Sequence, residues 1–428
     1  MSKYKDTIYA LSTPTGKSAI AIIRISGKQS LNVLKKISLI KKISPNRQKL
    51  TFLKFKEEII DQVLVVFFKK PNSFTGEEMV EINCHGSTAI ITKIYKILDE
   101  LGIRLAEPGE FTRRSLMNDK LDLLQTEGLI DLINSETEKQ RSMAISGLSG
   151  KLSKFVNETN EQLRLMLANT EALIDFSDED LPKNILENLL EQNKNIIKRI
   201  EKEIINSEIS KPIRDGFVVS LVGKPNTGKS SFINFINKKE VSIVTNIPGT
   251  TTDLVTSILD INGDKFTFVD TAGIRKHKNV IEKIGIERSL QSADNSDLNI
   301  VFLTNNEKKN YQKIKNKIFV KSKYDKNKLK ISGVYNISSV SGYGVNNLLQ
   351  VISKKISTKP KTGPIFSRER HLDNLKKSLY FLEKVNLDKI DIAAENIRRS
   401  LIHIKGINEK FDIEKILDII FNDFCIGK

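Results

Sequence analysis

The chain has 428 residues, of which 39% are hydrophobic and 28% charged, so global disorder is excluded and two to four domains are expected. No apolar run approaches the roughly 18 residues of a membrane span, the first residues lack a signal-peptide core, and two cysteines cannot form a disulfide framework. We therefore expect a cytoplasmic protein without stable membrane insertion. The formal net charge of +17 favours a polyanionic partner such as nucleic acid, although a lysine-rich composition can equally reflect an AT-rich genome.

The first part of the chain has the pattern of a mixed α/β domain. Residues 19–25 and 62–68 are apolar runs typical of strands, and residues 87–101 carry apolar side chains at helical spacing. From residue 118 the pattern becomes helical and continues to about residue 209, where Lys211-Pro212 is expected to end the helix.

Strand and helix patterns then alternate, as in a βαβ domain. Residues 216–222 form a short apolar run typical of a buried parallel strand. Beyond a linker at 357–364, helical periodicity returns at 372–385, 390–404 and 413–421. A helical unit as short as this last piece is only marginally stable alone. We therefore predict a helical domain made of two segments, with an α/β domain inserted between them; the expected bounds are 1–117, 118–213, 214–360 and 361–428.

The strongest motif is the string GKPNTGKS at residues 223–230, which matches a phosphate-binding loop between a predicted strand and a predicted helix. Its glycines let backbone N–H groups surround phosphates, and the helix N-terminus adds a positive dipole. Lys229 is expected to reach the β- and γ-phosphates, and the Ser230 hydroxyl to bind Mg²⁺. The motif predicts a nucleoside triphosphate site.

Further motifs follow in the order of a GTPase. Thr251, in the string GTTTD, is the expected second Mg²⁺ ligand, and Asp270 and Gly273, in DTAG, are expected at the metal-bound water and the γ-phosphate. In the string SKYD, Asp325 can accept hydrogen bonds from guanine N1 and N2, a pair of donors that adenine lacks. The predicted GTP-binding residues are Gly223, Asn226, Thr227, Gly228, Lys229, Ser230, Ser231, Thr245, Thr250, Thr251, Asp270, Thr271, Ala272, Gly273, Ser322, Lys323, Asp325 and Ser338.

Two positions depart from the common GTPase pattern. Ser322 replaces the usual Asn of the base-reading motif, so we expect weaker nucleotide binding with guanine specificity retained. Ile274 stands where Ras-like GTPases carry the Gln that orients water, and an isoleucine cannot do this. From the residues alone, Glu282, Glu287 and His277 are alternatives for that role.

The chain resembles the MnmE (TrmE) family of tRNA-modifying GTPases along nearly its whole length. In the N-terminal region the resemblance rests on RISG at 24–27, NSFTGE at 72–77, CHG at 84–86, PGEFT at 108–112 and NDKLDL at 118–123. It is completed by GKPNTGKSS, GTTTD, DTAGIR and IGIER in the GTPase region and by FCIGK at the C-terminus.

The resemblance implies a multidomain α/β and all-α protein, with an N-terminal α+β folate-binding domain, a helical domain and an inserted Ras-like P-loop GTPase domain. It implies a homodimer through the N-terminal domains and a heterotetramer with MnmG (GidA), a partner that uses FAD and NADH. The complex would add a carboxymethylaminomethyl-type group to C5 of the wobble uridine of certain tRNAs. The one-carbon unit would come from 5-formyl- or 5,10-methylene-tetrahydrofolate.

The resemblance also assigns residues to the hydrolytic site. K⁺ would be held by Asn226 and by the loop carrying Thr245, Ile247 and Thr250, and Glu282 aligns with the family's water-orienting glutamate. K⁺ would stimulate hydrolysis by offsetting charge on the transferring phosphoryl group. Thr252 departs from the family's usual Arg, which puts a role of that Arg in closure of the site in doubt.

Folate-binding positions are implied at Arg24, Glu81, Lys120 and Lys428, and the terminal motif makes Cys425 a functional thiol, with a structural cysteine as the alternative. A Cys84–His85 dyad is not expected, because neighbours on a strand point to opposite faces. The alternative to a tRNA-modifying enzyme is a regulatory GTPase of ribosome assembly or of a membrane. The N-terminal motifs and the FCIGK end argue against that alternative.

Overall fold

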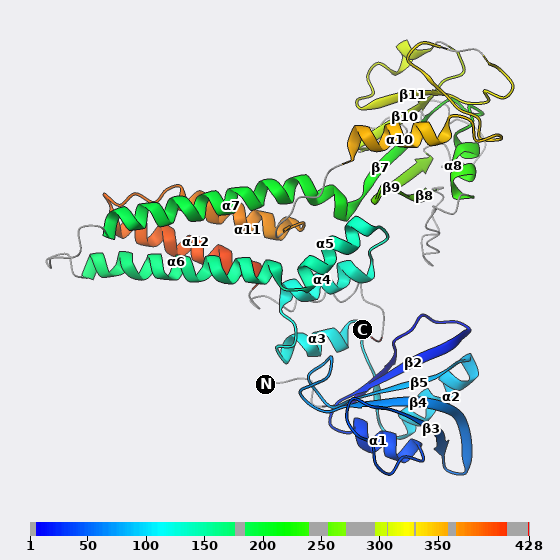
Figure 1. Ribbon diagram of the computed structural model, residues 1–428, viewed down its shortest axis with the longest axis vertical. Coiled ribbons are helices and arrows are strands. Elements are labelled where there is room, and N and C mark those ends of the chain that lie inside the picture. Colours follow the sequence, from blue (N-terminus) through cyan, green and yellow to red (C-terminus); the bar gives the residue numbers. More distant parts are fainter. Residues whose placement is uncertain are drawn as a thin grey trace, which may run out of the picture. The chain divides into compact units, whose positions relative to one another are not determined.

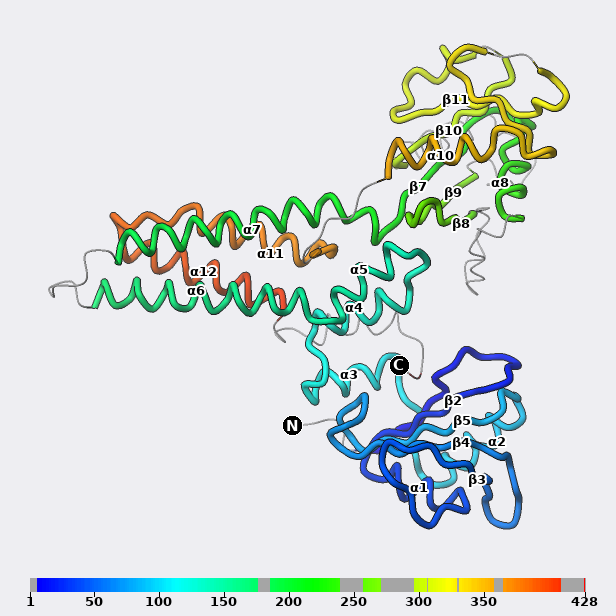
Figure 2. The backbone as a smooth tube through the Cα atoms, viewed as in Figure 1, coloured from blue at the N-terminus to red at the C-terminus, as the bar shows by residue number. Residues whose placement is uncertain are grey.

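The computed structural model describes residues 6–175, 185–238, 256–270, 296–305, 307–328, 331–357, 365–408 and 427. The chain divides into two compact units, one made of residues 1–130 and 405–428 and the other of residues 131–404. The expected fold class is confirmed: a mixed N-terminal domain is followed by long helices, and an α/β domain is inserted between them (Figures 1 and 2). The four expected domain bounds stay predictions.

The N-terminal domain is built on a six-stranded mixed sheet with the order β3-β4-β5-β2-β1-β6. Its strands are β1 (Ile8–Leu11), β2 (Ser18–Ser26), β3 (Gln48–Phe55), β4 (Glu58–Phe68), β5 (Met79–Gly86) and β6 (Arg104–Leu105). Its helices are α1 (Ser30–Ile37), α2 (Thr88–Glu100) and α3 (Glu110–Met117), followed by α4 (Leu123–Ile133). The strands expected at 19–25 and 62–68 are β2 and β4, and the helix expected at 87–101 is α2.

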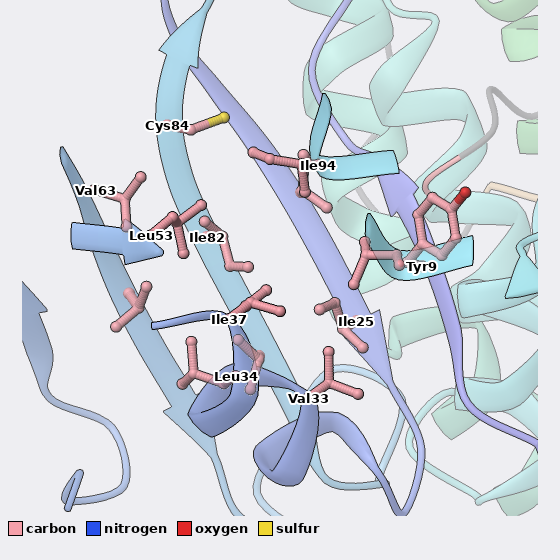
Figure 3. Close-up of a cluster of buried hydrophobic side chains, with 14 of the residues drawn as sticks. Tyr9, Ile25, Val33, Leu34, Ile37, Leu53, Val63, Ile82, Cys84 and Ile94 are labelled. Carbon is pink, nitrogen blue, oxygen red and sulfur yellow. The ribbon is translucent and has the colours of Figure 1, made fainter. Parts of the chain in front are cut away.

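The core of this domain lies between one face of the sheet and helices α1 and α2. Leu34 of α1 and Ile94 of α2 pack with Val63 and Ile82 from the strands, and all four are almost fully buried (Figure 3). Side chains alternate along a strand, so residues between these positions point to the opposite face. That opposite face carries Arg24 and Glu81.

The long helices of the second unit are α5 (Glu138–Leu148), α6 (Lys151–Asp175), α7 (Ile185–Asp215), α11 (Glu369–Leu382) and α12 (Ile390–Asn408). Helix α7 packs against α6 and α11 (Figure 1), and Phe381 of α11 stacks on His403 of α12 at 5.7 Å. The two separated helical segments therefore pack together, as expected for a domain interrupted by an insertion. In the described ranges, no helix is long and apolar enough to cross a membrane.

The expectation that Lys211-Pro212 ends the helix is wrong. Helix α7 continues through Pro212 to Asp215. Proline removes one helical N–H, but the backbone N–H of Gly216 still donates to the Pro212 carbonyl at 2.9 Å, so the last turn closes. Gly216 then ends the helix with a φ of +80°, a conformation that glycine adopts without strain.

The inserted domain is a second six-stranded sheet with the order β12-β11-β10-β7-β9-β8. Its strands are β7 (Phe217–Gly223), β8 (Thr256–Ile261), β9 (Asp264–Asp270), β10 (Leu298–Phe302), β11 (Lys317–Lys321) and β12 (Tyr335–Asn336), and its helical segments are α8 (Lys229–Asn237), η1 (Lys308–Tyr311) and α10 (Val345–Ile356). All neighbouring pairs are parallel except β8 and β9. The carboxyl ends of β7, β9 and β11 therefore meet at one edge, where ligands of such sheets bind.

Candidate functional site

The phosphate-binding loop runs from the end of β7 to the start of α8. Gly223 and Gly228 have φ values of +148° and +99°, and an added Cβ at Gly228 would lie 2.4 Å from the Ser322 hydroxyl. Asn226 has a positive φ of 61° and is exposed at the tip of the loop. Thr227 closes the loop by donating its hydroxyl to the Lys224 carbonyl at 2.8 Å. Close approach of the chain therefore requires glycine at both ends of the loop.

The charged and hydroxyl groups of the loop are oriented by backbone and by β9. The Lys229 ammonium is buried and donates to the carbonyls of Gly223 at 2.7 Å and Lys224 at 2.8 Å. The Ser230 hydroxyl donates to the Asp270 carboxylate at 2.8 Å, and Asp270 is 1% exposed at the end of β9. A hydroxyl and a carboxylate side by side at a phosphate-binding loop form the donor set that Mg²⁺ takes in P-loop GTPases, so these residues fit that ion.

The base-reading loop follows β11. Ser322 is buried and donates its hydroxyl to the carbonyl of Thr227, which ties this loop to the phosphate-binding loop. The Asp325 carboxylate accepts from the Ser338 hydroxyl at 2.6 Å, and this hydrogen bond holds the pKa of Asp325 below its ordinary value. Asp325 is thus kept ionised and oriented, as an acceptor for two guanine N–H groups must be.

The structure brings together most of the predicted nucleotide-site residues that it describes. Lys323 of the base-reading loop donates to the Asn226 carbonyl at 2.9 Å, whereas Ser231 is exposed on the first turn of α8. The remaining predicted residues of this site lie outside the described residues; they are Thr245, Ile247, Thr250, Thr251, Thr271, Ala272, Gly273 and Glu282.

In the N-terminal domain, Arg24 and Glu81 are cross-strand partners on β2 and β5. The Arg24 Nε donates to Glu81 at 2.8 Å, and both side chains are about one-fifth exposed at 23% and 18%. The guanidinium also lies 5.7 Å from the centroid of the Phe74 ring. The structure therefore places a partly exposed ion pair beside an aromatic ring, and this arrangement suits the binding of a flat, polar heterocycle.

The segment 72–77 connects this ion pair to the third predicted folate residue. An added Cβ at Gly76 would lie 3.1 Å from the Cγ of Lys120, so the lysine stem packs directly on this segment. Asn118 donates its side-chain amide to the Thr75 carbonyl at 2.7 Å. Arg24, Glu81 and Lys120 are thereby gathered around one loop, although they are far apart in sequence.

A buried ion network beside this loop was missed by the sequence analysis. Arg114 of α3 is 1% exposed and contacts Glu110 at 2.8 Å and Glu77 at 3.1 Å. Burial acts to raise the pKa of Glu110, but hydrogen bonds from Arg104 and Arg114 outweigh it and lower that pKa. Glu77 and Glu110 lie in the NSFTGE and PGEFT strings, so charged residues inside those strings were the available signal.

The C-terminus is anchored on the loop after β1. The Ser12 hydroxyl donates to the Gly427 carbonyl at 2.9 Å. Gly427 is buried with a φ of +106°, and an added Cβ there would lie 2.0 Å from the Leu11 carbonyl oxygen. Cys425 and Lys428 lie outside the described residues, but their neighbour Gly427 fixes this end of the chain on the N-terminal domain.

The absence of a Cys84–His85 dyad agrees with the structure. Cys84 points into the core, and burial raises the pKa of its thiol to about 11 (Figure 3). His85 is exposed and contacts Asp61 at 2.7 Å on the other face. In the described residues, no group of three or more His, Cys, Asp or Glu side chains could hold a metal ion.

Comparisons with known proteins cover nearly the whole chain. A family model described as "GTP-binding protein TrmE N-terminus" matches residues 7–120, and one described as "MnmE helical domain" matches residues 123–425. The chain is 38% identical to the tRNA modification GTPase MnmE of Rickettsia bellii and 37% identical to that of Aquifex aeolicus, over 99% of this chain and all of each relative.

Among solved structures, Era of Aquifex aeolicus bound to GDP and aluminium fluoride matches 39% of this chain and 66% of its own, at 24% identity and a TM-score of 0.27. The G domain of the T. maritima FeoB iron transporter matches 32% of this chain and 98% of its own, at 25% identity and a TM-score of 0.26.

Proposed function

Because the chain belongs to the MnmE (TrmE) family of tRNA modification GTPases, we propose that it is a K⁺-stimulated GTPase that acts with a flavin-dependent partner on the wobble uridine. The product is a carboxymethylaminomethyl-type group on C5 of that base in certain tRNAs. GTP hydrolysis drives the opening and closing of the GTPase domains. The tRNA substrate places this activity in the cytoplasm.

The contact between Ser230 and Asp270 is the observation that carries the hydrolytic part of the proposal. It joins the carboxyl end of β9 to the phosphate-binding loop at 2.8 Å, while Lys229 is already held over the loop by two carbonyls. On GTP binding, Lys229 exchanges these carbonyls for phosphate oxygens, and Asp325 binds the guanine edge. Ser230, with Thr251 as second ligand, would hold Mg²⁺, which would neutralise charge on the phosphates.

K⁺ dependence follows from the family pattern around Asn226, whose exposed position at the tip of the loop leaves its side chain available to a cation. Thr245, Ile247 and Thr250 complete the proposed K⁺ site. Hydrolysis by the purified protein in KCl and in NaCl at equal ionic strength tests this directly. Strong stimulation by KCl is expected, and equal rates in the two salts would contradict the K⁺ mechanism.

Glu282 is the proposed water-orienting residue, because Ile274 cannot take that role. We expect Glu282→Ala to keep nucleotide affinity and to lose most K⁺-stimulated turnover, since a positioned base contributes about 10²–10⁴-fold to a rate. Glu287→Ala is the matched control, and it should retain turnover. Full activity of Glu282→Ala in a single-turnover assay would contradict the assignment.

The N-terminal domain is the proposed site of 5-formyl- or 5,10-methylene-tetrahydrofolate. Glu81 can pair with the amino and ring N–H groups of a pterin, while Arg24, Lys120 and Lys428 can meet carboxylates of the glutamate tail. The ion pair of Arg24 and Glu81, its contact with Phe74 and the anchoring of Gly427 support this proposal.

Cys425 lies two residues before the anchored Gly427, which supports a role for its thiol at the folate site. Cys425→Ser should leave GTP hydrolysis and folate binding intact and abolish tRNA modification. If the variant modified tRNA at the normal rate with the partner present, Cys425 would be a structural cysteine.

We also propose a homodimer through the N-terminal domain. The outer face of its sheet carries exposed apolar side chains, and Leu50 and Leu64 are cross-strand partners that are 60% and 40% exposed. In the next strand Asn83 pairs with Leu64 and with Ile22, which lies two residues from Arg24 on the same face. A second copy packed on this face would bury the leucines and border the folate site.

Sedimentation velocity of Leu50→Glu tests the dimer. The variant should be a monomer that retains guanine nucleotide binding, whereas Glu57→Gln, on the exposed turn beside this strand, should remain a dimer. The dimer then binds the FAD- and NADH-using partner, MnmG (GidA), as a heterotetramer. A dimeric Leu50→Glu would move the proposed interface elsewhere.

A further inference from the structure

The GTPase domain contains one of the two most basic segments of the chain; the other, residues 35–56 of the N-terminal domain, has eight basic and no acidic residues. Residues 307–328 contain nine lysines and two acidic residues, so a formal charge of +7, out of +17 for the whole chain, lies within 22 residues. Helix α7, at 185–215, is also rich in lysine but has six basic and six acidic residues. Lysine-rich segments of this chain therefore differ in net charge, and residues 307–328 belong to those with a large excess.

The structure gathers much of this charge around η1 and β11. Lys309, Lys313 and Lys315 are exposed on η1 and in the turn that follows it. Lys308 and Lys317 lie over the same Phe319 ring, with their Nζ atoms 5.7 Å and 6.0 Å from its centroid. We refer to the set Lys308, Lys309, Lys313, Lys315 and Lys317 as the η1–β11 lysine surface.

Two ammonium groups of this surface, those of Lys308 and Lys317, are held by backbone carbonyls without being neutralised. Lys317 donates to the carbonyls of Gln312 and Ile314, both at 2.8 Å, and Lys308 donates to the carbonyl of Ser332. Lys355 of α10 adds a further ammonium by donating to the Lys317 carbonyl at 3.0 Å. A backbone carbonyl fixes the position of an ammonium but leaves its positive charge uncompensated.

Carboxylates near the segment are engaged elsewhere. Glu307 accepts from Lys224 at 3.0 Å, and Asp325 accepts from Ser338 in the base-reading loop. Across the described part of the chain, none of the five lysines forms an ion pair with a carboxylate. The surface is therefore a local positive field of the kind that attracts a polyanion.

We propose that the η1–β11 lysine surface binds the phosphate backbone of the tRNA substrate, an inference that rests on the proposed function for the identity of the RNA. Lysines act on phosphates as point charges with three donors and carry no geometry for reading bases. The surface therefore supplies affinity and position. Selection of the tRNA lies with other contacts.

The test is tRNA binding by the full-length protein, measured by fluorescence anisotropy over a series of KCl concentrations. The variant K309Q/K313Q/K315Q removes three exposed charges that make no structural contact in the described residues. The matched control K194Q/K198Q/K202Q removes three exposed charges from the balanced helix α7. Neither variant touches the nucleotide site, so both should keep wild-type GTP hydrolysis.

We expect K309Q/K313Q/K315Q to weaken tRNA binding at least about tenfold near 0.15 M salt. The slope of log K against log salt should become shallower by roughly two to three, because each phosphate contact contributes about 0.7–0.9 to it. The control should stay within about twofold of wild type in affinity.

Four results would overturn the assignment. Unchanged tRNA binding by K309Q/K313Q/K315Q would exclude this surface as a tRNA-binding site. Equal weakening by both variants would show that tRNA affinity depends only on the net charge of the protein. Loss of binding to the flavin-dependent protein, with tRNA binding intact, would assign the surface to an acidic protein partner. If the wild-type protein bound no tRNA, the inference would fail while K⁺-stimulated hydrolysis, measured separately, still stood.

Discussion

In the GTPase domain, the side chains expected to bind GTP follow the ends of parallel strands. Lys229 and Ser230 come just after β7, Asp270 ends β9, and Ser322 comes just after β11. In the N-terminal domain, Arg24 and Glu81 lie inside two antiparallel strands and are 57 residues apart. In the nucleotide site, the positions of Lys229 and Ser230 are set by a local loop motif. In the N-terminal site, the meeting of Arg24 and Glu81 is set by the register of two strands.

The two regions also differ in how they use charge. The nucleotide site is built mainly from glycines, hydroxyls and backbone groups around one lysine. The N-terminal domain contains a fully buried arginine, Arg114, surrounded by acidic residues. We therefore expect substitutions in the N-terminal network to act mainly on folding and substitutions at the nucleotide site to act mainly on binding.

The largest expected effect is that of Arg114→Met. The substitution leaves the buried Glu110 without its nearest buried partner, and breaking such a pair costs about 3–5 kcal/mol. Hydrogen exchange of the β1 and α3 amides measures this as a loss of protection. Arg104→Met is the control, because Arg104 is partly exposed at 41% and its loss should cost less. Equal protection in Arg114→Met and wild type would show that the network does not stabilise the fold.

The same network predicts a dependence of stability on pH. The folded-state pKa of Glu110 is lowered, so its contribution is fully present above the unfolded-state value near 4.5 and is lost as pH falls through the folded value. Wild-type protein should therefore lose protection around β1 and α3 as pH falls below about 4.5. In Arg114→Met this loss should be smaller, because the hydrogen bond from Arg114 to the ionised carboxylate is gone and, of the two arginines, only Arg104 still donates to it.

Asp325→Asn has the next largest effect and tests the base-reading loop. A hydrogen bond to a charged group is worth about 1.5–3 kcal/mol, so GDP affinity should fall about 10- to 100-fold. An asparagine can donate to the oxygen that xanthine carries in place of the guanine amino group, so xanthine nucleotides should gain affinity. Competition binding measures both changes, and an unchanged preference for guanine would refute the role of Asp325.

The two regions also differ in how much of their structure the sequence could predict. The order β7, loop, α8 was predictable because one apolar run, two glycines and a lysine are contiguous. The continuation of α7 through Pro212 was not, because the helix needs only one more turn before Gly216 and local propensity does not reveal that. The meeting of Arg24 with Glu81 depends on the register of β2 against β5, so only family resemblance pointed to it.

Arg24→Gln tests the register-dependent site. Affinity for 5-formyl-tetrahydrofolate, measured by calorimetry, should fall at least about tenfold because a charge-assisted contact is lost. The free energy of unfolding should change by less than about 1 kcal/mol, since partly exposed ion pairs contribute little. Lys93→Gln, which breaks the exposed pair with Glu58 on the same domain, should change neither quantity. Unchanged folate affinity in Arg24→Gln would remove this residue from the proposed site.

The smallest expected effect lies in a pair of tyrosines, one of them in the SKYD string, whose stacking the sequence did not indicate. Tyr324 and Tyr343 stack with centroids 4.7 Å apart and planes 14° apart. Tyr324 also donates its backbone N–H to the Ile337 carbonyl at 3.1 Å. The stack thus ties the base-reading loop to the turn before α10, which carries Ser338.

This stack offers a physical reason why the loop tolerates Ser322 in place of the usual asparagine. Ser322 makes one hydrogen bond across to the phosphate-binding loop, and an aromatic pair contributes about 0.5–1.5 kcal/mol beyond its burial. Tyr343→Ala should therefore speed GDP dissociation about 2- to 10-fold, while Tyr343→Phe, which keeps the ring, should match wild type in a stopped-flow chase. If Tyr343→Ala had no effect in a Ser322→Asn background, the tyrosine stack would do here what the usual asparagine does, which is to hold Asp325 against the guanine. An effect of equal size in both backgrounds would show instead that the tyrosines act independently of Ser322.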